Sequence, residues 1–102
     1  MIRVIYRWRV DPDRRNEFAT WWHEGTMRIR STRTGAWGST LLAPTDDDSS
    51  HFVAVARWRC REDLEAFWAD PGGSPFGGAE LVSTEIFEEV DDLSLQDPTT
   101  DL

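Results

Sequence analysis

The stretch Ile2-Arg3-Val4-Ile5-Tyr6-Arg7-Trp8-Arg9-Val10 decides the fold of this chain, because its pattern returns at residues 51–60, HFVAVARWRC. In both stretches the residues alternate between the two faces of an extended chain, as in a β-strand with one buried face. Both also contain Arg-Trp-Arg and lead into a segment with helical periodicity. Chance recurrence in an Arg- and Trp-rich chain is the alternative, but the helix after each copy favours a repeated strand–helix–strand unit. Two such units predict an α+β, ferredoxin-like βαββαβ fold, with a four-stranded antiparallel sheet and two helices on one face.

The other elements follow from the same patterns. Asp11 is placed to cap the first helix and Pro12 to open it. This helix is expected to end near residue 33, and its apolar stripe consists of Phe18, Trp22, Gly25 and Ile29. Further along the chain we expect strands at 36–43 and 81–90, a helix at 61–70, a polar loop at 44–50 and a glycine-rich loop at 71–78. Residues 1–90 are thus expected to form one domain, and residues 91–102 an acidic tail that is frayed or reaches a partner.

Composition limits the functions that remain open. A net charge of −8 argues against nucleic acid and anionic membranes as partners, because both require a basic surface. The single cysteine, Cys60, excludes an internal disulfide and any site with several cysteine ligands. No apolar run reaches the roughly 20 residues of a membrane span, and the chain opens directly into a strand pattern without a signal peptide. We therefore expect a cytoplasmic location.

The two faces of the predicted sheet differ in composition. The face expected beneath the helices carries Val4, Tyr6, Trp8, Phe52, Ala54, Ala56 and Trp58, whereas the opposite face mixes Ile5, Val53 and Val55 with Arg3, Arg7, Arg9, Arg57 and Arg59. The opposite face is too apolar to be fully exposed to solvent and too charged to form a hydrophobic core. Glu85 and Glu89 could neutralise its arginines across strands or across an interface. These features favour a homodimer, and a solvated face with surface ion pairs is the alternative.

Small residues beneath the helices predict a cavity. Ala54 and Ala56 stand beside Trp8, Trp22 and Trp58, so the indoles could line a space that they do not fill. The alternative is that the helices move closer and the aromatic rings form an ordinary core. The loop at 72–78 brackets Phe76 between two glycine pairs, and could be a flap over the cavity or an inert connection.

Several motifs resemble those of the antibiotic-biosynthesis monooxygenase family of dimeric α/β-barrel proteins. The resemblance runs from about residue 2 to residue 90 and rests on residues 4–10, Pro12, Phe18, Trp22, Gly25-Thr26, residues 35–39 and residues 55–58. It implies a homodimer whose sheets pack together and a pocket between sheet and helices in each subunit. One branch of the family oxidises phenolic or anthrone-type aromatics to quinones without metal or flavin, and another degrades haem.

The resemblance favours the first branch over the second. The haem branch uses an asparagine on the first strand and a histidine after the second helix, and those positions hold Tyr6 and the segment near Gly78. The quinone-forming branch uses Trp, Tyr, Asn and Arg in its pocket. Here Trp and Tyr are available, whereas the single asparagine, Asn16, lies early in the first helix.

These points lead to a functional hypothesis: a monooxygenase that uses O2 and no cofactor or metal to oxidise a small or polycyclic aromatic. A deprotonated phenol can reduce O2 itself, so the protein must hold the ring, accept a proton and stabilise an oxyanion. Tyr6 is the candidate hydrogen-bond donor and His23 the candidate base. The candidate substrate-binding residues are Trp8, Trp22, Ala54, Ala56, Trp58, Trp68 and Phe76. A non-catalytic aromatic-binding protein, and an isomerase or cyclase on the same fold, remain alternatives.

Overall fold

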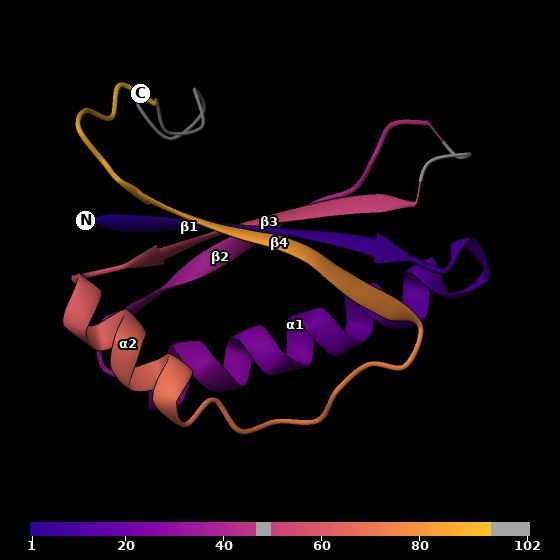
Figure 1. Ribbon diagram of the computed structural model, residues 1–102, viewed down its shortest axis with the longest axis horizontal. Coiled ribbons are helices and arrows are strands. Elements are labelled where there is room, and N and C mark those ends of the chain that lie inside the picture. The colour runs from indigo at the N-terminus through magenta and orange to yellow at the C-terminus, as the bar shows by residue number, and fades with distance from the viewer. Residues whose placement is uncertain (47–49, 95–102) are drawn as a thin grey trace, which may run out of the picture.

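A computed structural model describes residues 1–46 and 50–94 of the chain. Its elements are the strands β1 (Ile2–Val10), β2 (Ala36–Leu42), β3 (His51–Trp58) and β4 (Ala79–Glu88), the α-helices α1 (Arg15–Thr32) and α2 (Arg61–Ala69), and the short 3-10 helix η1 (Pro12–Arg14). The strands form one antiparallel sheet in the order β2-β3-β1-β4. Both α-helices lie on the same face of this sheet (Figure 1). The predicted ferredoxin-like α+β fold is therefore confirmed. The tail expected at 91–102 lies outside the described residues from position 95 onward.

The pairing of β4 with β1 explains why β4 begins and ends two residues earlier than expected; β3, expected over 51–60, also ends two residues early, at Trp58. Val4 pairs with Ala56 of β3 and Ile86 of β4, so apolar residues of three strands share the helix-covered face. Between Arg7 and Trp8 the register with β4 shifts, and Trp8 consequently pairs with Leu81. Pairing continues to the end of β1, so β4 occupies 79–88 rather than the expected 81–90.

The residues at the two ends of α1 explain where the helix begins and ends. The Asp11 carboxylate accepts a hydrogen bond from the Asp13 backbone N–H at 3.1 Å, and one 3-10 turn precedes the α-helix. After the helix the chain turns at Gly35, where φ is +75°. A Cβ at this glycine would stand 2.0 Å from Asp63 Oδ2, so both the turn and the approach of α2 require the absence of a side chain.

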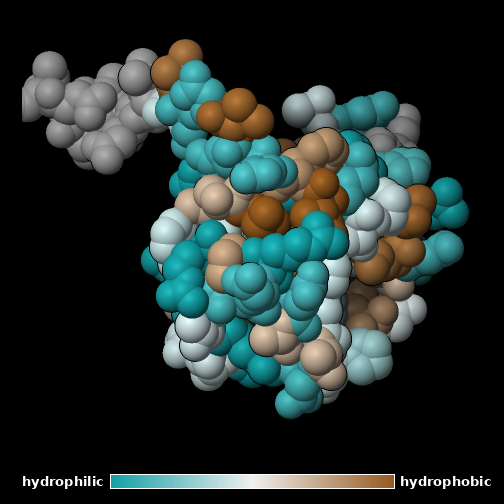
Figure 2. All heavy atoms as spheres, turned by 60° about the vertical axis from the view of Figure 1, so that its left-hand side comes forward, coloured by the Kyte–Doolittle hydropathy of each residue, from teal (hydrophilic) through white to brown (hydrophobic). Residues whose placement is uncertain are grey.

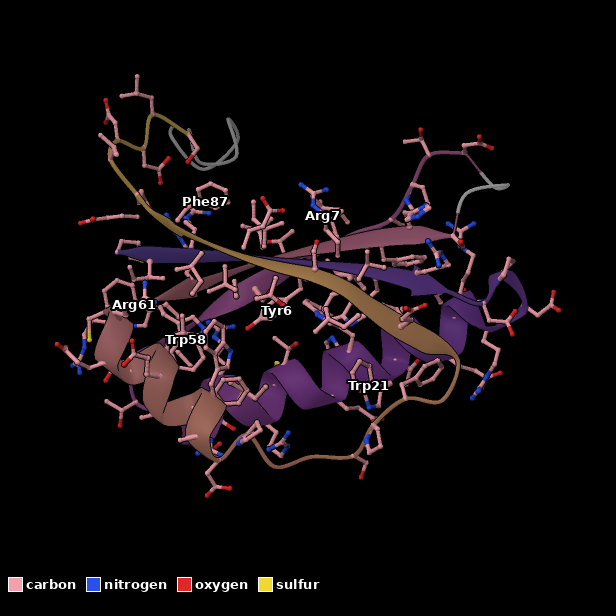
Figure 3. All side chains as sticks on the ribbon, viewed as in Figure 1. Tyr6, Arg7, Trp21, Trp58, Arg61 and Phe87 are labelled. Carbon is pink, nitrogen blue, oxygen red and sulfur yellow. The ribbon has the colours of Figure 1, made fainter. Side chains whose placement is uncertain are left out.

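Two apolar clusters fill the space between sheet and helices. The first, here called the α2-end cluster, consists of Val4, Ala56, Trp58 and Leu64 with the partly buried Ile2, Tyr6, Ile29, Ala36, Phe67 and Ile86. The second, the η1-end cluster, consists of Val10, Phe18 and Phe52 with the partly buried Trp8, Trp21, Leu41, Phe76 and Ala79. Tyr6 and Trp58 point toward the helices, whereas Arg7 and Phe87 point to the other side of the sheet (Figure 3).

The face of the sheet away from the helices carries ion pairs between neighbouring strands. Arg7 Nε lies 3.0 Å from Glu85 Oε1, and Arg3 Nε lies 3.0 Å from Glu89 Oε2. These contacts join β1 to β4 and to the residue that follows it. The glutamates thus neutralise arginines within one chain, which is one of the two arrangements considered above.

The surface is largely polar. On the side seen in Figure 2, hydrophilic side chains predominate and the hydrophobic ones lie in small groups. Within residues 1–46 and 50–94, no helix has the length and apolar character needed to cross a membrane.

Candidate active site

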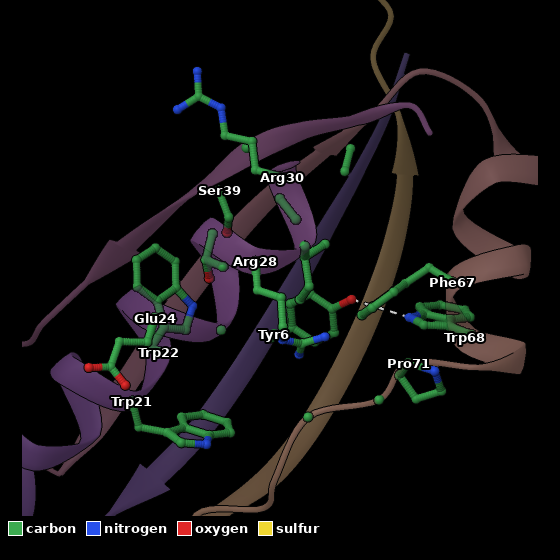
Figure 4. A pocket seen from close by; sticks show the side chains of 18 of the residues that line it. Tyr6, Trp21, Trp22, Glu24, Arg28, Arg30, Ser39, Phe67, Trp68 and Pro71 are labelled. Carbon is green, nitrogen blue, oxygen red and sulfur yellow. Dashed lines mark hydrogen bonds between the residues drawn. The ribbon is translucent and has the colours of Figure 1, made fainter. Parts of the chain in front are cut away.

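A cavity of about 660 Å³ lies between the sheet, the two helices and the loop that follows α2. Its lining comes from β1–β3, α1, α2, the loop and the start of β4 and comprises Tyr6, Trp8, Trp21, Trp22, Glu24, Gly25, Thr26, Arg28, Ile29, Arg30, Ala36, Gly38, Ser39, Ala56, Arg57, Trp58, Phe67, Trp68, Pro71, Gly72, Gly73, Ser74 and Leu81. Figure 4 shows the side chains around this space. Volumes of this order suit small organic ligands.

Missing side-chain volume explains why the space is open. On α1, a Cβ at Gly25 would meet no atom within 4 Å, although Gly25 lies on the stripe that faces the sheet. Ala56 of β3 and Ala36 of β2 face the same space from the sheet.

Flat rings make up much of the wall. Tyr6 stacks on Trp8, with ring centroids 5.6 Å apart and an interplanar angle of 23°. Trp58 stacks on Phe67 at 5.2 Å and 26°. The wall therefore consists of preformed stacked pairs against which a planar apolar ligand can pack.

The Tyr6 hydroxyl is the polar group at the centre of this wall. Trp68 Nε1 donates a hydrogen bond to Tyr6 Oη at 3.3 Å (Figure 4). Since the indole is the donor, the phenolic proton is not used in this bond, and it finds no acceptor among the described residues. Burial raises the pKa of the Tyr6 phenol above its ordinary value, and the hydrogen bond from Trp68 opposes the shift in part. The hydroxyl therefore stays protonated at neutral pH and can donate to an oxygen of a ligand.

Six of the residues proposed from the sequence come together around the cavity, namely Tyr6, Trp8, Trp22, Ala56, Trp58 and Trp68. Three others do not reach it. Ala54 is completely buried within the sheet–helix layer, two residues from Ala56, but does not border the space. His23 is exposed and borders a separate hollow with Trp37 and Arg57, because it lies one position off the helical stripe.

The third residue, Phe76, packs into the η1-end cluster. Its ring centroid lies 5.7 Å from those of Phe18 and Trp21, and the Arg14 guanidinium lies 4.5 Å from its ring centroid. These contacts hold Phe76 in the core, while residues 71–74 of the same loop line the cavity. Phe76, proposed as a substrate-binding residue, therefore packs in the core, and the loop is neither a flap that closes this ring over the cavity nor an inert connection.

Sequence reasoning did not assign Trp21, Phe67 or Arg28 to the site, although all three line the cavity. Trp21 is anchored by a hydrogen bond from its Nε1 to the Ser74 carbonyl oxygen at 2.8 Å. Trp21, Gly25 and Arg28 are spaced by four and three positions, which places them on one helix face. That spacing was the available signal, and the stripe centred on Trp22 obscured it.

Comparison with known proteins identifies the family. The family model described as antibiotic biosynthesis monooxygenase matches residues 1–72. The chain belongs to this family. The predicted resemblance is thereby confirmed. The comparison with curated proteins found no match.

Solved structures of similar fold include members with different activities. The heme-degrader MhuD of Mycobacterium tuberculosis, solved with two hemes in its active site, superposes with a TM-score of 0.76 at 20% identity, covering 92% of this chain and 100% of that one. SnoaB, a cofactor-independent oxygenase of Streptomyces nogalater, gives a TM-score of 0.71 at 20% identity, covering 90% of this chain and 95% of that one. At such identities the likeness concerns the fold, so the side chains of the cavity must decide between these chemistries.

The antibiotic biosynthesis monooxygenase fold in this chain offers no imidazole to a heme in the cavity. His23 borders the separate hollow, and His51 is exposed at the start of β3 and does not line the cavity. Histidine is a frequent axial ligand of heme iron, and the residues that line the cavity include none. Within the described residues no cluster of three metal-binding side chains occurs. A heme in this cavity would therefore have to be held by a group other than histidine.

Proposed function

We propose that the protein is a cofactor-independent monooxygenase that oxidises a planar, electron-rich aromatic substrate of the phenol or anthrone type with O2. One observation carries the proposal: the Tyr6 hydroxyl has a proton to donate and lies in the wall of a cavity built from stacked aromatic rings. Such a wall can hold a flat ring and exclude water, and the phenol can contact the oxygen on which negative charge develops.

The proposed chemistry balances without a further reductant. Oxidation of an anthrone methylene to the quinone carbonyl consumes one O2 and releases one H2O, because the substrate supplies both hydrogens and four electrons. The substrate reacts as its phenolate, having lost its proton to solvent, and the charge on the phenolate oxygen makes electron transfer to O2 possible. Tyr6 donates its hydrogen bond to this oxygen and orients the ring. Tyr6, rather than a histidine, is then the polar group that contacts the reacting substrate.

Oxygen consumption tests the proposal. Anthrone and a dihydroxynaphthalene are supplied to the purified protein in the presence of a metal chelator, and O2 uptake is followed with an electrode. We expect uptake equal to the quinone formed, and a loss of about a hundredfold in kcat for Tyr6→Phe, as for removal of one oxyanion donor. Thr20→Ala is the matched control, because it removes a hydroxyl from an exposed position of α1 outside the cavity.

Other outcomes would contradict the proposal in recognisable ways. Binding of both compounds without O2 uptake would indicate an aromatic-binding protein. Conversion of a substrate under nitrogen would indicate an isomerase or cyclase. Equal rates for Tyr6→Phe and wild type would remove Tyr6 from the chemistry.

We further propose that two copies pair through the sheet faces away from the helices. On this face Leu42 and Phe87 are 50% and 48% exposed, and they lie beside strands that also present Ile5 and Val55. Pairing would bury these side chains among the arginine–glutamate contacts. Light scattering after size exclusion should give the mass of two chains. Phe87→Asp should give one chain, whereas Ala66→Asp, which adds the same charge on exposed α2, should leave the dimer intact. A monomeric wild-type protein would contradict this pairing.

A further inference from the structure

We propose that the substrate carries an acidic group and that Arg28 binds it at the mouth of the cavity. This inference rests on the proposed function and adds the chemical class of its substrate: a planar aromatic with a carboxylate or similarly acidic substituent. The observations that carry it are the missing partner of Arg28, its position, and the shape of the loop beside it.

Most arginines of the described chain are neutralised by carboxylates of the same chain. Ion pairs with aspartate or glutamate hold Arg3, Arg7, Arg9, Arg14, Arg57, Arg59 and Arg61. The Arg28 guanidinium, in contrast, makes no hydrogen bond or ion pair with residues 1–46 or 50–94. In a chain with nineteen acidic residues and a net charge of −8, an arginine without an acidic partner requires a reason.

The position of Arg28 beside the cavity explains why it lacks an acidic partner in the described part of its own chain. Its side chain runs from α1 into the cavity in Figure 4, whereas the side chain of Arg30 extends away from it. Arg57 also borders the cavity, but Asp92 Oδ2 lies 2.9 Å from its Nη2. Favourable interaction with the helix dipole accounts for Arg30 in the last turn of α1, and Arg28 precedes that turn. Within residues 1–46 and 50–94, Arg28 is thus a cation without an acidic partner whose side chain a ligand in the cavity can meet.

The loop after α2 leaves room for this guanidinium. Gly72 and Gly73 both have positive φ, at +65° and +77°. A Cβ at Gly73 would stand 2.6 Å from Arg28 Nη2, and one at Gly72 would stand 3.5 Å from Nη1. The two glycines therefore let the guanidinium lie against the loop backbone, where no side chain of the loop stands between it and a ligand. A planar guanidinium in this place fits a carboxylate by two parallel hydrogen bonds.

Paired probes test the inference by binding alone. Anthraquinone-2-carboxylate and its carboxamide have nearly the same shape and differ in charge, and their dissociation constants are measured by quenching of tryptophan fluorescence at two salt concentrations. We expect the wild-type protein to bind the carboxylate at least about tenfold more tightly than the carboxamide. Arg28→Gln should abolish this preference without changing the affinity for the carboxamide. Arg28→Lys should retain part of it, and Arg61→Gln, which removes the same charge from an exposed position of α2 outside the cavity, should retain all of it.

The outcomes separate this inference from the function on which it rests. Binding of both probes with equal affinity by the wild-type protein, or an undiminished preference in Arg28→Gln, would overturn the role of Arg28 and leave the aromatic cavity standing. Failure of both probes to bind would overturn both. Circular dichroism of Arg28→Gln shows that the variant is folded, which is expected because Arg28 is exposed and makes no side-chain contact by hydrogen bond.

Discussion

At one end of the helix-covered face, Phe18 is completely buried among the rings of Trp8, Trp21, Phe52 and Phe76, whereas at the other end the aromatic side chains surround a cavity of about 660 Å³. Both ends are rich in aromatic residues, so aromatic content does not decide whether a space is filled. The positions between the rings decide it. Phe76 from the loop completes the η1-end cluster, while Gly25 and Ala56 leave the other end open. A filled end that holds the fold and an open end that admits a ligand can therefore be built from one sheet face.

The largest expected effect on stability comes from removing a buried ring from the η1-end cluster. Phe18→Ala should lower the free energy of unfolding by about 3–5 kcal/mol, because the ring is fully buried and its neighbours cannot close the space. Chemical denaturation measures the change. Phe67→Ala is the matched substitution at the open end, where the ring is already partly exposed and contacts the Trp58 ring and the Arg33 guanidinium. It should cost clearly less, and equal losses would mean that the two ends are packed alike.

Two alanines on β3 sharpen the comparison. Ala54 is completely buried and does not border the cavity, whereas Ala56, two residues further, does. Ala54→Leu should therefore destabilise the protein by about 1–3 kcal/mol through overpacking. Ala56→Leu can place its side chain in the cavity, so it should change the unfolding free energy by less than about 1 kcal/mol and weaken binding of an aromatic probe at least tenfold. Denaturation and fluorescence titration of both variants check this, and the reverse assignment of the two effects would contradict the position of the cavity.

The sequence patterns sufficed for the sheet because alternation is a local property. The period of two in residues 2–10 and 51–60 determines which side chains lie under the helices, and the repeated Arg-Trp-Arg indicates that both strands have the same surroundings. The limits of β4 were missed by two residues because they are set by its pairing with β1, which runs from Ile2 opposite Glu88 to Val10 opposite Ala79. The residues of the strand itself carry no sign of it.

The site was harder to foresee because it depends on how a loop and a helix approach one another. Phe76 has a glycine-rich sequence context that fits a flap as well as an anchored loop, and contacts with Phe18 and Arg14 decide the matter. His23 differs from Trp22 by one position, and this single step of the helix takes it out of the cavity. For the strand residues Tyr6 and Trp58 the sequence predicted the correct face of the sheet, since alternation along a strand determines the face on which each side chain lies.

The pKa of Tyr6 can be measured by titration, and it reports whether the phenol is buried in the wall of the cavity. Burial raises the pKa of this phenol in the folded state, so the unfolded chain ionises first, near pH 10. The stability that comes from the neutral phenol is then complete below about pH 10 and is lost as the pH rises toward the folded-state pKa. Tyr6 is the single tyrosine of the chain, so its absorbance reports the ionisation directly. We expect a folded-state pKa above the ordinary value and a weaker alkaline loss of stability in Tyr6→Phe. A normal pKa in the folded protein would mean that water fills this part of the cavity.

The smallest expected effect on stability comes from removing the hydrogen bond that Trp68 donates to the Tyr6 phenol. Trp68→Phe keeps a ring in place but removes the N–H that Tyr6 Oη accepts at 3.3 Å. Because Trp68 is 38% exposed and the contact is long, the unfolding free energy should fall by less than about 1 kcal/mol at neutral pH. The pKa of Tyr6 should rise further, since the lost hydrogen bond stabilised the phenolate more than the phenol. Trp21→Phe removes the 2.8 Å bond to the Ser74 carbonyl at the border between the η1-end cluster and the cavity, and it should leave the Tyr6 titration unchanged. If both variants shifted that titration equally, the two ends would be coupled through the aromatic wall and could not be treated as separate parts of the face.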